Sequence, residues 1–427
     1  MEIENKIKKA RAWVDEEDYI RVVSHHDVDG ISSASIILNF LKRNNKKFYC
    51  SLLRNVNREL LNALDCDEKL CIIADMGSAY IDEIEKLDKR VIILDHHLPK
   101  RESKNESVLQ INPHLHDING SAEACASTLS YFLANEMDLI SFMIAGALGD
   151  RQGSEFSGLN KTFVDEAIEK GIIKKSFGVT IDCYDNSNLQ RKLETSIAPF
   201  FKDISGRNGA GEKISESLKG KSEKTVNSTL LLELLKQGCR EEVTSDLLGY
   251  VYSLPFRNMN SNELLSLFNV CDGLNMAEVG LSMALGDEKS YSEVIDKKEE
   301  YYKRALSGLV NLEKSGAIEK SRIQYFYSDN LAMSGLYASI SMNYFLDQEK
   351  ATLALTKTKE HLKISARGTR HLVKNGLNLA IALKEGAERV KGNGGGHDIA
   401  AGATVPLEEG VKFLDTTDEI IVKQMSR

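Results

Sequence analysis

Imidazole and carboxylate side chains follow an apolar segment near the start of the chain. His25, Asp27 and Asp29 stand at alternating positions directly after residues 19–24. Alternate side chains of an extended backbone point to the same side, so we expect these three groups to share one face. Two carboxylates and an imidazole suit a divalent cation. The alternative is a solvated strand end with acidic residues at the start of the next helix.

Three more apolar segments end in side chains of the same kinds. They are residues 70–74 before Asp75, residues 91–94 before Asp95, His96 and His97, and residues 144–149 before Asp150. In an open parallel sheet, ligand-binding groups gather at the carboxyl ends of the strands. The order of the segments therefore predicts that these acids and histidines meet at one edge of a sheet.

A dense run of glycines near the end of the chain is the other feature that could bind a ligand. It comprises Gly392, Gly394, Gly395 and Gly396, and His397 follows it. Glycines let a backbone approach a ligand closely and expose several N–H groups, and an imidazole can hydrogen-bond a phosphate or a base. Short glycine motifs are weak evidence by themselves. A tight turn into a strand at residues 400–406 is the alternative explanation.

In this order and spacing, the four N-terminal segments resemble motifs I to IV of the DHH phosphoesterase superfamily, named for Asp95-His96-His97. Residues 394–402 resemble the glycine-rich signature of that family's C-terminal associated domain. Residues 196–201 and 267–271 resemble stretches of RecJ-like nucleases, especially archaeal ones. One departure is that Asp272 and Gly273 stand where the RecJ segment usually reads Gly-Arg, so no arginine is available there for a phosphate.

The pattern of elements agrees with this resemblance. Strands that alternate with helices predict an α/β fold with a doubly wound parallel sheet in the first part of the chain. With the resemblance, we expect a DHH catalytic domain over residues 1–190 and a helical insertion with a linker helix over residues 191–313. A smaller C-terminal α/β DHH-associated domain, which binds substrate, should follow over residues 314–427. Within the insertion, residues 212–290 read as mostly helical.

The resemblance also implies a set of ligands for two divalent cations. His25, Asp27 and Asp75 would hold one ion, and the second would be held by Asp29, Asp75, His96 and Asp150. Asp75 would bridge the ions and be catalytic, and His97 would face the scissile phosphate. The donors favour Mn over Zn, with Mg as the alternative. Asp95 would orient the histidines, and the substrate would be contacted by His97, Arg367, Gly394, Gly395, Gly396 and His397.

The function implied is two-metal hydrolysis of phosphodiester bonds by a single-strand-specific exonuclease on DNA or RNA, in DNA replication or repair. The GINS replication complex is a candidate partner of the helical insertion. One alternative is a phosphodiesterase of nano-RNA or cyclic dinucleotides, although the smallest of these lack a segment like residues 191–290. Another is a replisome scaffold without catalysis, but the complete ligand set argues against it.

Composition limits the class of protein. The first 20 residues lack a continuous apolar core, and no window approaches 18 uncharged apolar residues, so we expect neither a signal peptide nor a membrane partner. Seven scattered cysteines without a CxxC pair indicate reduced thiols and a cytoplasmic protein. Because the net charge is -8, any surface that follows phosphates must be a local patch.

Overall fold

The structure is a computed structural model that describes residues 2–54, 56–245 and 247–426. The chain forms two compact units, each built from two stretches of sequence. The first unit comprises residues 1–177 and 249–298, and the second comprises residues 178–248 and 299–427. The predicted insertion, residues 191–313, is thus divided between both units, and the predicted three-domain division stays a prediction.

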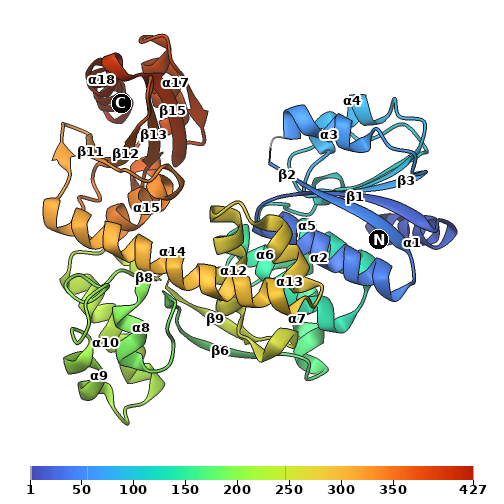
Figure 1. The fold of residues 1–427 in the computed structure, drawn as a ribbon, viewed down its shortest axis with the longest axis horizontal. Helices are drawn as coiled ribbons and strands as arrows, with labels where there is room; N and C mark the ends of the chain where they lie inside the picture. Colours follow the sequence, from blue (N-terminus) through green and yellow to red (C-terminus); the bar gives the residue numbers. More distant parts are fainter. Residues whose placement is uncertain (1, 55, 246, 427) are drawn as a thin grey trace. The chain divides into compact units, whose positions relative to one another are not determined.

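The first unit is organised around a parallel five-stranded sheet of order β2-β1-β3-β4-β5. Figure 1 labels the first three of these strands. Its strands are β1 (Tyr19–His25), β2 (Lys47–Leu53), β3 (Leu70–Ala74), β4 (Arg90–Leu94) and β5 (Val108–Ile111). Its helices are α1 (Glu2–Glu16), α2 (Val28–Arg43), α3 (Val56–Leu64), α4 (Ile81–Ile84), α5 (Ala126–Ala134), α6 (Ile140–Gly149), α7 (Gly158–Glu169), α12 (Ser261–Gly273) and α13 (Ala277–Ala284).

Alternation along the strands explains why helices cover both faces of this sheet. In β3, Ile72 and Ala74 join a core with residues of α1, α2, α5 and α6. Cys71 and Ile73 point the other way, into a smaller core with residues of α3 and α4. A strand buried on both faces reads as a continuous apolar run, which is what residues 70–74 show. The predicted doubly wound parallel sheet is confirmed.

The strand order also fixes where ligands can bind. The chain runs from β1 outward to β2, then returns to β3 on the other side of β1 and continues to β4 and β5. At such a switch point, the connections leave the two central strands in opposite directions and open a crevice at their carboxyl ends. His25 is the last residue of β1, and Asp75 directly follows β3.

The second unit contains a mixed six-stranded sheet of order β10-β11-β12-β13-β15-β14. Its strands are β10 (Ile318–Glu319), β11 (Ile323–Tyr327), β12 (Ala351–Lys357), β13 (His361–Arg367), β14 (Asn393–Gly396) and β15 (Ala400–Pro406). Its helices are α8 (Leu189–Glu194), α9 (Glu212–Leu218), α10 (Glu223–Lys236), α11 (Glu241–Ser245), α15 (Ser334–Tyr344), α16 (Arg370–Lys374), α17 (Leu379–Glu388) and α18 (Gly410–Met425). The core of this sheet packs against α17 and α18.

The helix α14 (Glu288–Ser315) and the strand β6 (Lys174–Val179) each cross a division between the units. The strands β7 (Asp182–Cys183) and β8 (Ser196–Ala198) pair with each other within the second unit. The stretch expected to be mostly helical, residues 212–290, contains the strand β9 (Leu248–Ser253). This strand pairs with β6. Its alternating Tyr250 and Tyr252 favour a strand, which the apolar residues around them had obscured. No helix among the described residues has the length and apolarity needed to cross a membrane.

Candidate metal centre

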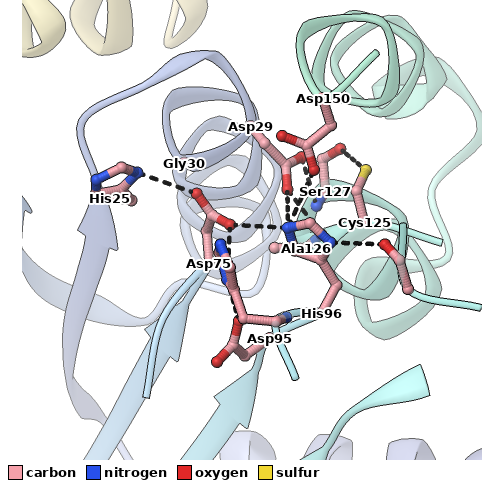
Figure 2. Close-up of polar contacts among 12 residues, drawn as sticks. His25, Asp29, Gly30, Asp75, Asp95, His96, Cys125, Ala126, Ser127 and Asp150 are labelled. Atoms are coloured by element: carbon pink, nitrogen blue, oxygen red, sulfur yellow. Dashed lines mark hydrogen bonds and ion pairs between the residues drawn. The ribbon is translucent and has the colours of Figure 1, made fainter. Parts of the chain in front are cut away.

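The first unit brings the other five predicted ligands together around Asp75, and Figure 2 labels four of these five: His25, Asp29, His96 and Asp150. One Asp75 carboxylate oxygen, Oδ2, lies 3.4 Å from Nδ1 of His25. The other, Oδ1, lies 3.4 Å from Nε2 of His96. Asp75 therefore stands between two imidazoles that come from the ends of β1 and β4.

The donors around this carboxylate form two sets of three, and Asp75 itself belongs to the first of them. His25, Asp27 and Asp75 make up one set, and Nδ1 of His25 is 2.8 Å from Oδ2 of Asp27. Asp29, His96 and Asp150 make up the other, in which Nε2 of His96 is 3.0 Å from Asp150 and 4.0 Å from Asp29. A third group, Asp75 with His96 and His97, overlaps both sets. The resemblance implied the first two sets, with Asp75 also in the second and His97 in neither, and these roles as ligands stay a prediction.

Asp27 and Asp29 reach their different sets because α2 begins between them, at Val28. The expectation that His25, Asp27 and Asp29 share one face of an extended backbone is wrong, since the strand ends at His25. Asp27 caps α2 and accepts a hydrogen bond from the Gly30 amide at 3.0 Å. A Cβ at Gly30 would lie 2.2 Å from the His25 carbonyl oxygen, so only glycine lets the helix begin this close to the strand.

Asp29 is held by the start of another helix. Its two carboxylate oxygens accept hydrogen bonds from the amides of Ala126 and Ser127, at 2.8 and 3.0 Å, in the first turn of α5. These amides would otherwise lack partners, and the positive end of the helix dipole favours a carboxylate there. The start of α5 thus holds the Asp29 carboxylate in a buried position.

Asp150 reaches the site from a helix and not from a strand. It follows α6 as the C-cap residue, whereas the apolar pattern before it suggested a strand end like the other three. The run 140–149 is apolar except for Ser141, because α6 is buried nearly all round. Periodicity cannot distinguish such a helix from a buried strand.

The tautomer of His96 is set by the backbone. Its Nδ1 lies 2.7 Å from the carbonyl oxygen of Gly120, which can only accept, so Nδ1 carries the proton. In the neutral ring, Nε2 then presents its lone pair to the carboxylates of Asp75 and Asp150. This is the arrangement that a metal-binding histidine requires.

Asp95 and His97 form a separate pair beside the cluster. Oδ1 of Asp95 accepts hydrogen bonds from Nδ1 of His97, at 2.8 Å, and from its amide, at 3.1 Å. Oδ2 accepts from the Ser78 amide. Asp95 is buried and the His97 ring is 60% exposed, so the ring is anchored at Nδ1 and open on its other side. This geometry fits the predicted orienting role of Asp95.

The crowding of carboxylates shifts their proton affinities. Burial and the nearby charge of Asp27 raise the pKa of Asp75 to about 7. Burial and the charge of Asp29 raise the pKa of Asp150 to about 9. Burial lowers the pKa of both ligand-type histidines, but contacts with carboxylates outweigh it and raise the pKa of His25 to about 10 and of His96 to about 11. The site therefore attracts positive charge, as protons or as cations.

These residues fit divalent cations. Both oxygens of Asp75 are buried, and among the described residues neither accepts a hydrogen bond. The same holds for Oδ2 of Asp150. Buried carboxylate oxygens that accept no hydrogen bond are costly, and a cation would satisfy them. Mixed carboxylate and imidazole donors suit Mn or Mg better than a site of thiolates would.

The predicted substrate residues Arg367, Gly394, Gly395, Gly396 and His397 all lie in the second unit. Arg367 ends β13, where its Nε donates to the Ser339 hydroxyl at 3.1 Å and Nη1 donates to the Ala366 carbonyl. The three glycines belong to strand β14, which pairs antiparallel with β15. The run is therefore an edge strand, and the turn expected at this place is formed by residues 397–399, closed by the His397 amide on Ala400 O.

Several residues near the cluster were not singled out from the sequence. His26 lies 3.2 Å from Asp272 of α12, next to Gly273, the position where an arginine was missing. Gly120 accepts from His96, and Gln152 donates to the same carbonyl oxygen at 2.9 Å. Neutral amides and a lone glycine form no pattern of residue type or spacing. Only the position of Gln152, two residues after Asp150, could have drawn attention to it.

Comparison with known proteins agrees with this geometry. The family model of the DHH family, N-terminal domain, matches residues 19–149, and that of the DHHA1 domain matches residues 323–423. A protein of Methanocaldococcus jannaschii, itself uncharacterised, is 32% identical over 419 residues, which cover 96% of this chain and 94% of that protein. This chain belongs to the DHH family. The resemblance seen in the sequence is confirmed.

Solved structures share the fold of this DHH protein. Cdc45 from Entamoeba histolytica has a TM-score of 0.66 at 12% identity, covering 98% of this chain and 99% of that one. An exonuclease RecJ bound to manganese has a TM-score of 0.60 at 16% identity, covering 97% and 94%. RecJ from Thermus thermophilus in complex with Mn2+ has 0.58 at 16% identity, and this chain spans 55% of it. The chain is therefore a DHH-family phosphoesterase with a RecJ-like fold.

Proposed function

We propose that this chain is a metal-dependent phosphodiesterase that acts as a single-strand-specific exonuclease on DNA or RNA. The observation that carries the proposal is the position of Asp75. Its two buried oxygens face two separate sets of donors, as a carboxylate that bridges two cations must. The manganese bound by RecJ proteins of the same fold supports the choice of ion.

The roles of the residues follow from their positions. His25, Asp27 and Asp75 would hold one Mn or Mg ion, and the other would be held by Asp29, Asp75, His96 and Asp150. When bound, the two ions lower the pKa of a water molecule and offset charge on the phosphoryl oxygens. The α5 amides hold the Asp29 carboxylate in place, and the Gly120 carbonyl holds the proton of the neutral His96 ring at Nδ1, so that Nε2 is the nitrogen available to a cation.

His97 is placed to meet the substrate. Asp95 holds the ring at Nδ1, so Nε2 is the nitrogen left for the scissile phosphate. The contact with Asp95 also raises the pKa of His97, which favours a ring that donates at both nitrogens. A donor at this position stabilises charge that grows on the phosphate during attack by water.

The second unit would bind the strand. Arg367 could hold a phosphate, and backbone groups of Gly394, Gly395 and Gly396 with His397 could follow the strand beyond it. The same proposal includes a cytoplasmic role in DNA replication or repair. It also includes binding of the GINS complex through the helical residues of the predicted insertion.

End-labelled substrates distinguish the proposed activity from its alternatives. With Mn, we expect stepwise shortening of single-stranded DNA or RNA of about 30 nucleotides and little attack on a blunt duplex. Faster turnover of di- to pentanucleotides or of a cyclic dinucleotide, with long strands left intact, would identify the small-substrate phosphodiesterase instead. Tight binding of Mn without hydrolysis of any of these substrates would favour a scaffold.

Asp75→Asn tests the bridging carboxylate. Asparagine has the same shape and also tolerates the left-handed backbone at this position, where φ is 59°, so the fold should be kept. Loss of the shared charge should lower the rate by more than about 100-fold, beyond the usual effect of losing a group outside the ligand set. Retention of Mn-dependent hydrolysis near the wild-type rate in the folded variant would contradict the assignment. A chelator should abolish wild-type activity, and added Mn should restore it.

A further inference from the structure

A chain of buried amide groups lies behind the metal centre in the first unit. Asn160 of α7 donates from Nδ2 to Oε1 of Gln152 at 2.6 Å, and Gln152 donates from Nε2 to Gly120 O at 2.9 Å. The Thr128 hydroxyl of α5 donates to Oδ1 of Asn160. Gln152 is 7% exposed, and Asn160 and Thr128 are fully buried. None of the residues in this series of hydrogen bonds is a predicted metal ligand.

Only one direction of hydrogen bonding satisfies the whole chain. A carbonyl oxygen cannot donate, so Gln152 must turn its amino group to Gly120 and its oxygen to Asn160. Asn160 must then present its oxygen to Thr128, whose own oxygen accepts from the Cys125 amide at 3.2 Å. The orientation of each amide is thus set by its neighbour. Removal of one member leaves others buried without partners, which is costly.

The two ends of this series of hydrogen bonds contact the groups that hold His96 and Asp29, two members of the second set of donors. At one end, Gly120 O accepts from both Gln152 and Nδ1 of His96. At the other end, Thr128 and Cys125 shape the first turn of α5, whose amides bind Asp29. Gly120 is closely packed, because a Cβ there would lie 2.4 Å from the His96 carbonyl oxygen. The amide chain therefore connects the support of His96 with the support of Asp29.

We propose that Gln152 and Asn160 are positioning residues that hold His96 and Asp29 at the spacing a cation requires. The inference rests on the proposed function, since it assumes that these two residues bind an ion. Gln152 fixes the Gly120 peptide and with it the ring of His96, and Asn160 ties that peptide to α5. Partners of metal ligands commonly change metal affinity when they are lost, although they touch neither ion nor substrate.

The test compares Gln152→Met and Asn160→Leu with a matched control, Gln110→Met, in the full-length protein. Each substitution replaces a buried amide by an apolar side chain of similar size. Gln110 is equally buried, lies on β5 of the same unit and accepts from the Ser103 amide, outside the chain described above. Two quantities are measured at a temperature where all variants are folded. They are the affinity for Mn by titration and the exchange rate of the His96 Nδ1 proton by NMR without any metal.

Gln152→Met and Asn160→Leu should each bind Mn roughly 10- to 100-fold more weakly than wild type, and Gln110→Met should bind Mn as wild type does. The His96 Nδ1 proton should exchange faster only when Gln152 or Asn160 is changed. The double variant Gln152→Met/Asn160→Leu should be no weaker than the poorer single variant, because either change already interrupts the chain. This lack of additivity distinguishes one connected unit from two independent losses of stability.

Two results would overturn the inference. One is an Mn affinity that falls no further in the Gln152 and Asn160 variants than in the Gln110 control. The other is additive losses in the double variant. If wild type binds no Mn at all, it is the proposed function that fails. The exchange of the His96 proton, measured without metal, then decides the positioning role by itself, and an unchanged rate rejects it.

Discussion

At the scale of single residues, the site depends on where protons and cations compete. Asp75 and Asp150 are buried among other carboxylates, and their pKa values are raised to about 7 and about 9. His25 and His96, with pKa values of about 10 and about 11, also hold protons at neutral pH when no cation is bound. A cation must displace these protons, so its binding is linked to pH.

We therefore expect the affinity for Mn to rise with pH. The sign follows from the raised pKa values: below them the donors are protonated, and ion binding releases protons, which higher pH favours. Each displaced proton contributes roughly a tenfold gain in affinity per pH unit below its pKa. Calorimetric titration at several pH values between about 6 and about 8 checks this. An affinity independent of pH would show that the ion-free site carries no proton.

The adjacent histidines should differ when each is replaced. His96→Ala removes a donor that faces Asp75 and Asp150, so the purified protein should contain less Mn. His97→Ala leaves the donors in place and should mainly lower the turnover number, because its ring is anchored to Asp95 and open to solvent. Elemental analysis beside kinetics separates these effects. Equal metal loss in the two variants would contradict the division of roles.

At the scale of elements, the glycines of β14 differ in what packs against them. A Cβ at Gly394 would lie 2.5 Å from the carbonyl oxygen of Leu383 in α17, so packing alone explains this glycine. A Cβ at Gly395 would have no atom within 4 Å. Nothing in the described structure requires glycine at position 395. A physical reason for glycine there is that it lets the protein backbone approach a ligand closely.

Alanine substitutions at Gly394 and Gly395 test whether packing or ligand binding requires each glycine. Gly395→Ala should leave the melting temperature near that of wild type and weaken the binding of single strands by roughly fivefold, about the value of one hydrogen bond. Gly394→Ala should lower the melting temperature, because α17 or β14 must move. Thermal unfolding and binding titrations of both variants check this. Wild-type binding by Gly395→Ala would place the substrate elsewhere.

At the scale of the whole molecule, the two units divide the proposed work. The metal donors all precede residue 151, while Arg367 and the glycine strand belong to the second unit. Neither group of residues could by itself both hold and cleave a polymer. The binding of a long strand should therefore depend on charges in the second unit, even when the metal centre is inactivated.

Arg367→Ala, in a background that carries Asp75→Asn, tests this division. Loss of a charged hydrogen bond to phosphate should weaken the binding of single strands by about 1.5 to 3 kcal/mol. The slope of log affinity against log salt should fall by about 0.7, because one fewer phosphate is neutralised. Arg389→Ala, which removes an exposed arginine of the same unit, is the matched control and should change neither quantity. Unchanged affinity and slope for Arg367→Ala would make Arg367 a structural residue of β13.

The sequence by itself determined the parallel sheet of the first unit and the residue types at the ends of its strands. Apolar runs that end at His25, before Asp75 and before Asp95 were enough to predict a parallel sheet with a ligand cluster, because strand order and direction place such ends together. Residue types and the spacing of apolar residues reflect local structure. They therefore indicate which helix or strand a residue belongs to and at which end of it the residue lies. The glycine run stood out by composition, but its place as the edge strand β14 did not.

Tertiary structure alone decided which donors belong together. Asp27 and Asp29 separate because α2 starts between them, and Asp150 comes from the end of a helix that packs beside α2 and α5. The amide chain of Gln152 and Asn160 joins elements that are distant in sequence, and neutral amides carry no local signal. Partners of this kind depend on how buried helices pack against one another, which is a property of the folded chain and not of any segment within it.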